Sequence, residues 1–397
     1  MTTSVHPGHD RWVATARTVA AGLAEDAVAR DRANLPPFDE IARLREAGLL
    51  TLLIPADRGG AGADWRTAYA VIREIAAGDG SIGQLLGYHY LLSWNVRFFG
   101  DAAHTERLER AAAEGRWLWG GAFNPRDPDV LLTPDGDGFL LEGRKSFATG
   151  ARVADRLVVG ATRADTGEPL VVLVDPGHPG VVRHDDWDSF GQRLSASGSI
   201  EFHAVPVAAD AVIGSLSQEE GALSPFATLV TPTIQLIFVH FYLGIAEGAL
   251  AAARDYTRTT TRPWALSDVE AAVQDPYTLA AYGELTVAAR ATAALADVAA
   301  AAVQRGLDLG PALTEEERGE IAVTVATAKV SATRSALDVT SRILELTGAR
   351  STASQLGFDR FWRNARVHTL HDPVAYKLRE VGDHFLNGAH PPFTLYT

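Results

Sequence analysis

The stretch RNARVHTLHDPVAYKLREVG, from Arg363 to Gly382, contains two histidines three residues apart, the second followed directly by Asp372-Pro373. Aspartate is favoured at a helix N-cap and proline at the position after it, so this pair predicts the start of a helix. His371 then lies on a joint between two helices, where its side chain can point into a cleft. The two histidines could also bind a metal, but no Glu/His pattern on another helix supplies further ligands, and we predict no metal site.

Along the chain, the pattern of apolar residues changes twice. From about residue 10 to residue 116, apolar residues recur every three or four positions and predict helices. Short apolar runs between Gly, Pro and Asp turns follow, and they predict a compact β-barrel or sandwich. After about residue 217 the helical spacing returns, and it predicts a bundle of long helices over residues 219–259, 275–305, 314–346 and 372–386. We therefore predict an α+β protein with three domains, over residues 1–116, 117–216 and 217–397.

Composition and charge narrow the classes of partner. The net charge of −13 argues against a nucleic-acid or anionic-membrane surface. The chain has no cysteine, which excludes disulfides, thiolate nucleophiles and Cys-ligated zinc and fits a cytoplasmic location. The N-terminus lacks the basic-then-apolar order of a signal peptide. Residues 229–253 could span a membrane by length, but polar residues interrupt them, and we predict a buried bundle helix instead.

Polar residues that a core does not require mark candidate sites among the predicted helices and strands. His89 and Ser93 are four residues apart and share one helical face, although an interior histidine without a catalytic role fits the same pattern. Asn124 ends a predicted strand before a proline and could be a simple turn former. Phe147 and Thr149 alternate along a predicted strand and share one face. A ring and a hydroxyl on one face suit a flat heteroaromatic ligand, and they are equally compatible with ordinary strand residues.

Nucleotide-binding motifs are missing from the sequence. There is no G-x-G-x-x-G after a strand and no P-loop, so a cofactor phosphate would have to be held by arginines and helix ends. The best candidates are Arg262 in YTRTTTRPW, and Gly348 and Arg350 in ELTGARS. As isolated arginines, both would ordinarily be solvated surface residues.

Three features together resemble the acyl-CoA dehydrogenase superfamily over nearly the whole chain: the helix–β–bundle order, GRKSFATGA and RNARVHTLHDPVAYK. HDPVAYKLREVGDHFLNG and YTRTTTRPW resemble its flavin-dependent monooxygenase branch, which includes dibenzothiophene monooxygenase, indole hydroxylases and amine N-hydroxylases. The resemblance implies an N-terminal helical domain, a central β-barrel, a C-terminal four-helix bundle and a homotetramer.

The resemblance also implies roles for the residues around the flavin ring. Phe147 falls where the family packs an aromatic ring on the flavin, and Thr149 where it hydrogen-bonds the isoalloxazine edge. Asn124 falls at a position that faces the reactive edge of the flavin. His89 and His371 are the best acid or base candidates, because imidazole titrates near neutral pH.

Further roles concern the substrate and the flavin phosphate. Ser93, on the face of His89, and Phe123 are candidates for the substrate pocket. By resemblance, Arg262 holds the flavin phosphate from a neighbouring subunit. Gly348 and Arg350 lie where the family's bundle contacts the phosphate or the adenosine side of the cofactor.

Two departures from the dehydrogenase pattern decide the predicted chemistry. Where many dehydrogenases have a catalytic Glu in the last joint, this chain has His371-Asp372-Pro373. The acyl-CoA-binding type of stretch is replaced by FNPRDPD. We therefore predict the oxygenase component of a two-component monooxygenase, which takes reduced flavin (FMNH2 or FADH2) from a separate NAD(P)H:flavin reductase.

In such enzymes dioxygen adds to the flavin to give a C4a-hydroperoxide, and one oxygen atom passes to a small substrate, for which an indole or thiophene is the leading expectation. Three alternatives stay open on the sequence. They are an amine N-hydroxylase or nitrososynthase of the same branch, an acyl-CoA dehydrogenase, and a non-catalytic oligomer that has kept the fold.

Overall fold

The computed structural model describes residues 7–395 except residues 125, 128, 218 and 220. Its first part is helical, as predicted: α1 (His9–Ala33), α2 (Phe38–Glu46), α3 (Trp65–Gly78), α4 (Gly80–Phe99) and α5 (Ala102–Gly115). Aspartates begin three of these helices, because the carboxylates of Asp64, Asp79 and Asp101 accept hydrogen bonds from backbone N–H groups of the first turn. Asp79 separates α3 from α4, at the break predicted from GDGS.

The central region is one sheet of eight strands: β1 (Trp119–Ala122), β2 (Leu131–Asp135), β3 (Gly138–Lys145), β4 (Arg156–Arg163), β5 (Pro169–Val174), β6 (Val181–Arg183), β7 (Ile200–Val207) and β8 (Val212–Ser215). The order is β6-β7-β3-β2-β4-β5-β8, and β1 pairs in parallel with the first half of β4. Two of these strands were not predicted. β2 contains Pro134, which argues against a strand, and β8 is only four residues long.

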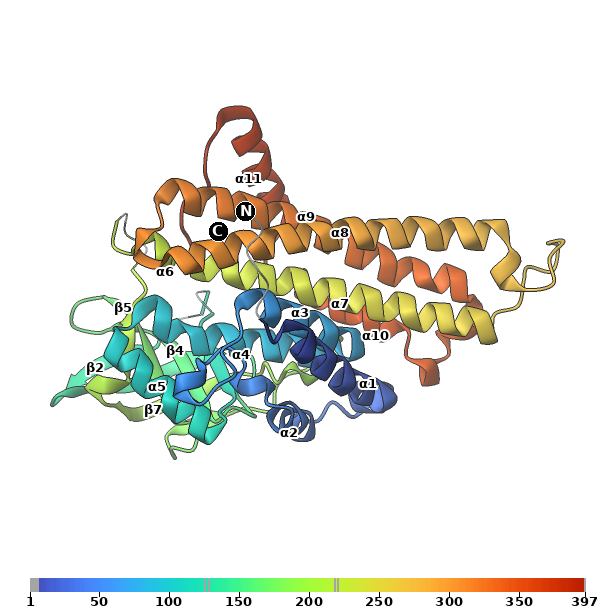
Figure 1. Ribbon diagram of the computed structural model, residues 1–397. Helices are drawn as coiled ribbons and strands as arrows, with labels where there is room; N and C mark the ends of the chain where they lie inside the picture. The colour runs from blue at the N-terminus through green and yellow to red at the C-terminus, as the bar shows by residue number, and fades with distance from the viewer. Residues whose placement is uncertain (1–6, 125, 128, 218, 220, 396–397) are drawn as a thin grey trace.

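The C-terminal region is a bundle built from α6 (Pro225–Thr228), α7 (Val230–Thr259), α8 (Pro276–Leu309), α9 (Glu315–Thr347), α10 (Asp359–His368) and α11 (Val374–Asn387). The long helices α7, α8 and α9 reach well beyond the sheet and form an arm that ends in the loop between α7 and α8 (Figure 1). The predicted start near residue 219 was wrong, because Ser224 and Pro225 begin this helical region instead. α10 was not predicted as a separate helix.

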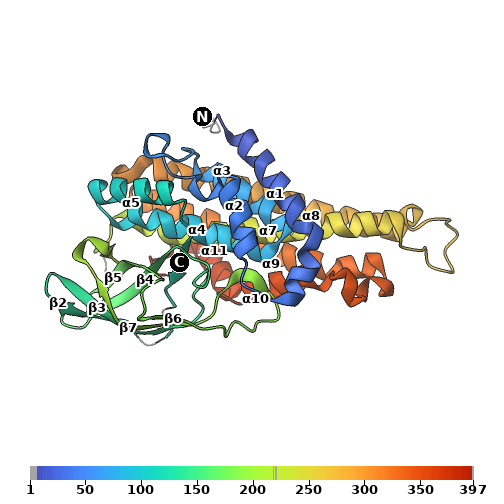
Figure 2. The same cartoon turned by 90° about the horizontal axis from the view of Figure 1, so that it is seen from below.

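Two helical segments, Pro225–Thr259 and Pro276–Ala312, are long and apolar enough to span a membrane by length and composition. In the first, 72% of the most apolar window is buried inside the protein, so its apolar character is explained by packing. One hydrophobic core is shared by the N-terminal helices and the bundle, and the sheet has its own. The helix α4 packs against α7 on one side and β1 on the other, so it runs where all three regions meet (Figure 2).

Candidate active site

A cavity of about 1320 Å³ opens where α4, the sheet and the joint between α10 and α11 come together. One wall is a single face of α4, whose lining residues are spaced three or four apart: Gln84, Tyr88, Leu91, Leu92, Asn95 and Phe99. Loops that leave the sheet form the opposite wall, and the joint at residues 367–373 forms a third. The volume exceeds the ~300–1,000 Å³ of ordinary ligand pockets, so it can hold a cofactor ring together with a substrate.

The sheet side of the cavity contains the predicted pair Phe147 and Thr149. The predicted strand alternation was wrong, because β3 ends at Lys145 and both residues lie in the turn that follows. The backbone of Phe147 has φ +52°, a conformation that is strained for a bulky residue. Its ring is 66% exposed at the cavity and touches the edge of Trp187. Thr149 is buried, and its hydroxyl lies 3.0 Å from that of Ser197.

Asn124 and Phe123 line the same wall just after β1. The Asn124 side-chain amide donates a hydrogen bond of 3.0 Å to Ser146 Oγ, and its Oδ1 accepts one of 3.1 Å from the backbone of Arg126. Ser146 is in turn held by the carboxylate of Asp127. The residues predicted to face a flavin ring are therefore gathered at one wall and fixed by neighbours.

The joint places His368 and His371 side by side at the cavity. His368 is the last residue of α10 and His371 follows it in the turn, and the two rings stack with centroids 5.4 Å apart. The hydroxyl of Tyr88 lies 3.2 Å from His368 Nε2, and the hydroxyl of Tyr242 lies 2.8 Å from Nδ1. The imidazole of His368 thus joins a cavity-lining tyrosine to a tyrosine of the core.

The Tyr242 hydroxyl has two hydrogen-bond partners on one residue. It lies 3.0 Å from the carbonyl oxygen of His368, to which it can donate, and 2.8 Å from Nδ1, which donates to it in the Nδ1–H tautomer. Burial lowers the pKa of His368 well below its ordinary value, so the ring is neutral, and in this tautomer Nε2 accepts from Tyr88. Burial, and next the charge of Asp372, raise the pKa of Tyr88. Tyr88 therefore keeps its proton at neutral pH, and its hydroxyl lies between His368 and the cavity.

A buried ion pair lies behind the joint. The Nζ of Lys329, on α9, donates to Asp372 Oδ1 at 3.2 Å and to Gln235 Oε1 at 2.8 Å, and it lies 4.4 Å above the ring of Phe238. Asp372 Oδ1 also lies 3.2 Å from His371 Nδ1. This corrects the prediction for Asp372: α11 begins at Val374 with Pro373 at the N-cap, and the carboxylate binds Lys329 and His371 instead of capping the helix.

The electrostatics of this pair keep Asp372 ionised. Burial alone would raise the pKa of the carboxyl, but the hydrogen bond with His371 and the charge of Lys329 outweigh burial and lower it. Burial lowers the pKa of Lys329 to about 8 in spite of the neighbouring carboxylate. At neutral pH the arrangement is His371–Asp372⁻–Lys329⁺, and the carboxylate fixes the orientation of the His371 ring.

His89 and Ser93 do share one face of α4, but it is not the face that lines the cavity. His89 Nε2 lies 2.8 Å from the carbonyl oxygen of Leu50, and Nδ1 accepts a hydrogen bond of 3.1 Å from the backbone of Trp119. Burial lowers the pKa of His89 to about 4, so it is neutral. The Ser93 hydroxyl donates to the Tyr90 carbonyl at 3.0 Å. We therefore revise both assignments: these side chains connect α4 to its neighbours.

The predicted phosphate residues lie away from the cavity of their own chain. Arg262 is exposed in the loop between α7 and α8, at the far end of the arm (Figure 1). Gly348 and Arg350 follow the C-terminal end of α9, and Arg350 is exposed as well. None of the three lines the cavity.

Several cavity residues were missed by sequence reasoning because nothing in their local pattern distinguishes them from core. Among the described residues, buried amide atoms of Gln84, Asn95 and Gln192 have no hydrogen-bond partner, and all three residues line the cavity. Gln192 is 1% exposed and both of its side-chain amide atoms lack a partner. Buried polar groups of this kind are normally satisfied, so they fit a bound ligand with polar edges.

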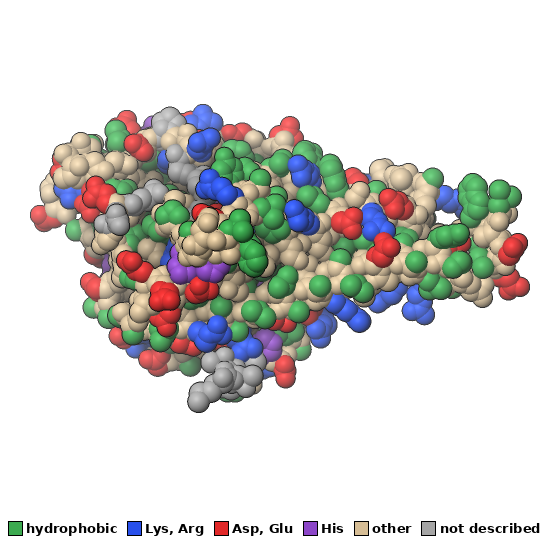
Figure 3. Space-filling view, turned by 90° about the horizontal axis from the view of Figure 1, so that it is seen from above, with side chains coloured by type: hydrophobic (Ala, Val, Ile, Leu, Met, Phe, Trp, Pro, Cys, Tyr) green, Lys and Arg blue, Asp and Glu red, His purple; other side chains and the backbone are tan. Residues whose placement is uncertain are grey.

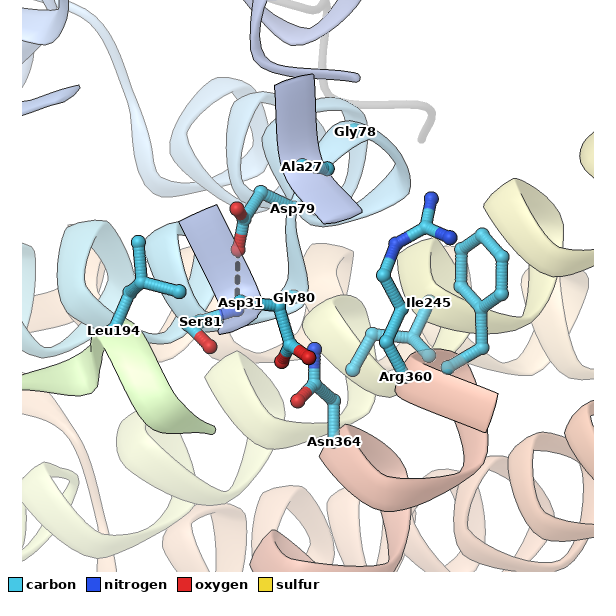
Figure 4. A pocket seen from close by; sticks show the side chains of 11 residues that line it. Ala27, Asp31, Gly78, Asp79, Gly80, Ser81, Leu194, Ile245, Arg360 and Asn364 are labelled. Carbon is cyan, nitrogen blue, oxygen red and sulfur yellow. Dashed lines mark hydrogen bonds between the residues drawn. The ribbon is translucent and has the colours of Figure 1, made fainter. Parts of the chain in front are cut away.

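A small polar cluster beneath the cavity fixes the helix that carries His368. It lies where α1, α4 and α10 meet and surrounds a space of only about 10 Å³, the size of one water (Figure 4). Asn364, one turn before His368, accepts a hydrogen bond of 2.8 Å from the backbone of Gln192. Arg363 pairs with Asp31 of α1. The cluster therefore ties α10 to the loop that carries Gln192.

The chain matches the acyl-CoA dehydrogenase family in three consecutive parts. They are the N-terminal domain over residues 7–116, the middle domain over residues 120–205 and the C-terminal domain over residues 236–375. The dibenzothiophene monooxygenase of Rhodococcus erythropolis is 44% identical over 389 residues, which cover 94% of this chain and 93% of that protein.

Two further relatives carry information on the cofactor. A Pseudomonas putida protein named "Probable FMNH2-dependent monooxygenase SfnC" is 39% identical over 387 residues, covering 97% of both chains. The crystal structure of TdsC from Paenibacillus sp. A11-2, in complex with FMN and indole, is 41% identical and superposes with a TM-score of 0.94. The match covers 98% of this chain and all of that one.

Proposed function

This chain belongs to the acyl-CoA dehydrogenase family and to its flavin-dependent monooxygenase branch, and on that premise we propose that it is the oxygenase component of a two-component monooxygenase. Reduced flavin, as FMNH2, supplies two electrons to dioxygen; one oxygen atom enters a small aromatic heterocycle such as an indole or thiophene, and the other leaves as water. The observation that carries the proposal is the joint: in place of a carboxylate free to remove a proton, it presents His371, which is held by Asp372, and Asp372 is in turn paired with Lys329.

The cavity residues fit a flavin ring. The exposed face of Phe147 is available for stacking, and the hydroxyl of Thr149 and the amide of Asn124 can hydrogen-bond polar atoms at the reactive edge of the ring. The unpartnered amide of Gln192 provides a donor and an acceptor side by side, which suits the alternating N–H and C=O groups of the pyrimidine ring. Phe123 and the apolar residues of α4 complete the substrate side.

Tyr88 and His371 serve proton transfer in this proposal. Tyr88 holds a proton at the cavity wall, and its hydroxyl is positioned by His368 Nε2. His371 is oriented by Asp372 and is a second acid or base candidate, with a side chain 37% exposed. The apolar side chains of the cavity, among them Leu91, Leu92, Phe99 and Phe123, exclude water and protect the oxygen chemistry from wasteful side reactions.

Assembly into a homotetramer would complete the flavin site. The arm of each chain carries uncovered apolar side chains, including Trp264, Tyr277 and Val287. If this surface packs on a neighbouring copy, Arg262, Gly348 and Arg350 can reach the flavin phosphate of the neighbour's cavity, which they do not line in their own chain.

We also retain as proposals a cytoplasmic location, the domain limits of residues 1–116, 117–216 and 217–397, and a separate NAD(P)H:flavin reductase as partner.

The test supplies FMNH2 or FADH2 from an added NADH-driven flavin reductase under ¹⁸O2, with indole and dibenzothiophene as substrates. We expect product containing one ¹⁸O atom per molecule, faster with FMNH2 than with FADH2. A matched reaction offers acyl-CoA to the flavin-loaded protein, and no flavin reduction is expected. Flavin bleaching by acyl-CoA without any oxygenated product would establish the dehydrogenase alternative instead.

A further inference from the structure

Two histidines and a glutamate meet on the face of the bundle opposite the sheet. Glu320 lies in α9, His384 in the last turn of α11, and His390 in the C-terminal tail after α11. His390 Nε2 is 2.9 Å and His384 Nε2 is 3.6 Å from Glu320 Oε1, and the two rings stack with centroids 5.1 Å apart. In the space-filling view of this side, histidine side chains gather next to acidic ones (Figure 3). None of the three residues lines the cavity described above.

The position of the His390 ring against α9 requires a glycine at residue 319. Gly319 precedes Glu320, and a Cβ at this position would lie 2.4 Å from Cγ of His390, so any side chain would displace the ring. His384 Nδ1 is buried and has no hydrogen-bond partner in the described part of the chain. The glycine brings His390 against α9, and the partly buried His384 of α11 reaches the same carboxylate oxygen.

The donor set is that of a transition-metal site. Imidazole nitrogen and carboxylate oxygen bind Zn²⁺ at about 2.0–2.2 Å, which places neighbouring donors of a tetrahedral site roughly 3.3 Å apart. The separations of 2.9 and 3.6 Å lie on either side of this value. Among the described residues, these three form the one group of His, Asp or Glu whose ligand atoms all lie within 4.8 Å of one another. Imidazole donors favour Zn²⁺-like ions over Mg²⁺ or Ca²⁺.

We propose that Glu320, His384 and His390 bind one divalent transition-metal ion of the Zn²⁺ class, with water at the fourth position. The site lies apart from the cavity, so its role is structural: it fastens the C-terminal tail to α9 and α11. The same tail reaches the cavity. The carbonyl oxygen of Pro391 accepts a hydrogen bond of 3.0 Å from Arg318, that of Thr394 accepts one of 2.9 Å from Thr231, and Leu395 lines the cavity.

The sheet offers a matched comparison of the same residue types. Glu201 contacts His184 Nε2 at 3.2 Å and His203 Nε2 at 3.3 Å, but the two imidazoles lie on different oxygens of the carboxylate. The three ligand atoms do not come within 4.8 Å of one another. This set therefore has the composition of a metal site without its geometry, and it serves as the control.

The experiment titrates Zn²⁺, and in a second series Co²⁺, into the tag-free, chelator-treated full chain at pH 7.5. We expect one ion per chain by calorimetry. Affinity should fall more than about 100-fold in His384→Gln/His390→Gln, beyond the loss caused by removing an outer-shell partner, and stay unchanged in His184→Gln/His203→Gln. With Zn²⁺ bound, hydrogen exchange at Phe393 and Leu395 should slow.

Three results bear on the proposal. Absence of stoichiometric binding to the wild-type chain would overturn it, as would equal binding by both double variants. If His384→Gln/His390→Gln fails to fold, Glu320→Gln replaces it, since this substitution keeps the shape of the side chain and removes its charge. Retention of one tight ion by folded Glu320→Gln also overturns the proposed ligand set.

Discussion

The inner end of the bundle, next to the cavity, and its outer end, the arm that ends in the loop between α7 and α8, differ in how completely their side chains are covered. At the inner end, Lys329 is 1% exposed, yet its charge is matched by Asp372 and its N–H groups by Gln235. At the outer end, apolar side chains such as Trp264 (71% exposed) and Val287 (68%) face solvent in the single chain. The inner end is thus complete within one chain, and the outer end is complete only when another surface covers it.

This contrast predicts different consequences of mutation at the two ends. Variants at the inner end should damage the site of the chain that carries them. Variants at the outer end should act through a neighbouring chain.

Tyr88→Phe removes the hydroxyl that contacts His368 at the cavity. We expect substrate oxygenation to fall by about 10²–10⁴-fold, the range associated with loss of a positioned proton donor, with FMN binding retained. Ser93→Ala, on the same helix but outside the cavity, should keep wild-type turnover. Product formation and FMN titration measure the two effects. Comparable losses in both variants would show that the face of α4 does not decide function.

Lys329→Met removes one partner of the buried ion pair and leaves the Asp372 carboxylate uncompensated. We expect a loss of about 3–5 kcal/mol in the free energy of unfolding, measured by urea denaturation. The double variant Lys329→Met/Asp372→Asn removes both charges and should recover most of that loss. A loss of less than about 1 kcal/mol in the single variant, as at an exposed pair, would contradict the assignment of Lys329 to a closed inner core.

The contribution of Lys329 to the free energy of unfolding should depend on pH. The pKa of Lys329 is lowered to about 8, below its unfolded value, so the folded chain binds fewer protons than the unfolded chain between pH 8 and the unfolded pKa. The contribution of Lys329 to stability is therefore unfavourable below pH 8 and is relieved as pH rises through that window.

Activity should show the opposite trend from this stability term. Above pH 8, Asp372 loses its counter-charge and holds His371 in a different orientation, so turnover should fall roughly tenfold per pH unit. The Lys329→Met variant should not show this fall in turnover above pH 8, because the methionine side chain does not titrate. The pH profile of initial rates for both proteins checks the prediction, and an identical fall in the variant assigns the titration to another group.

The sequence predicted the features that depend on local patterns and missed those that depend on contacts between distant residues. Period and turn patterns predicted the helical, β and helical regions, because such signals are local. The resemblance identified Asn124 and Thr149, and the structure places both at the cavity wall. The sequence offered His89 and His371 as acid or base candidates; His371 lines the cavity, whereas on α4 the neighbouring face, with Tyr88, lines it instead of His89.

The remaining misses depend on long-range contacts. Lys329 lies 43 residues from Asp372 in the sequence, and Gln235 lies 94 residues from Lys329, so no local pattern connects them. The helix start at Asp372-Pro373 was predicted one residue too early because the carboxylate had a stronger partner elsewhere in the fold. A buried cation outweighs a cap worth about 1 kcal/mol, since leaving that charge unpaired costs several times more.

Arg262 tests the outer end, where the expected effect is smaller. Arg262→Ala should weaken FMN binding by about 10–100-fold, the value of one charge-assisted hydrogen bond of about 1.5–3 kcal/mol. Arg254→Ala provides a control, because Arg254 is exposed in the same arm and pairs with its neighbour Asp255. FMN affinity, measured by calorimetry, should be unchanged in that variant.

Mixing two impaired chains tests whether the outer end serves a neighbour. A Tyr88→Phe chain has a damaged cavity and an intact arm, and an Arg262→Ala chain has the reverse. In mixed oligomers from co-expression, some cavities of Arg262→Ala chains receive the arm of a Tyr88→Phe chain, and turnover at low FMNH2 should rise above that of either variant alone. If Arg262 served the cavity of its own chain, no mixture would contain an intact site, and the mixed protein would be no more active than the average of its parents.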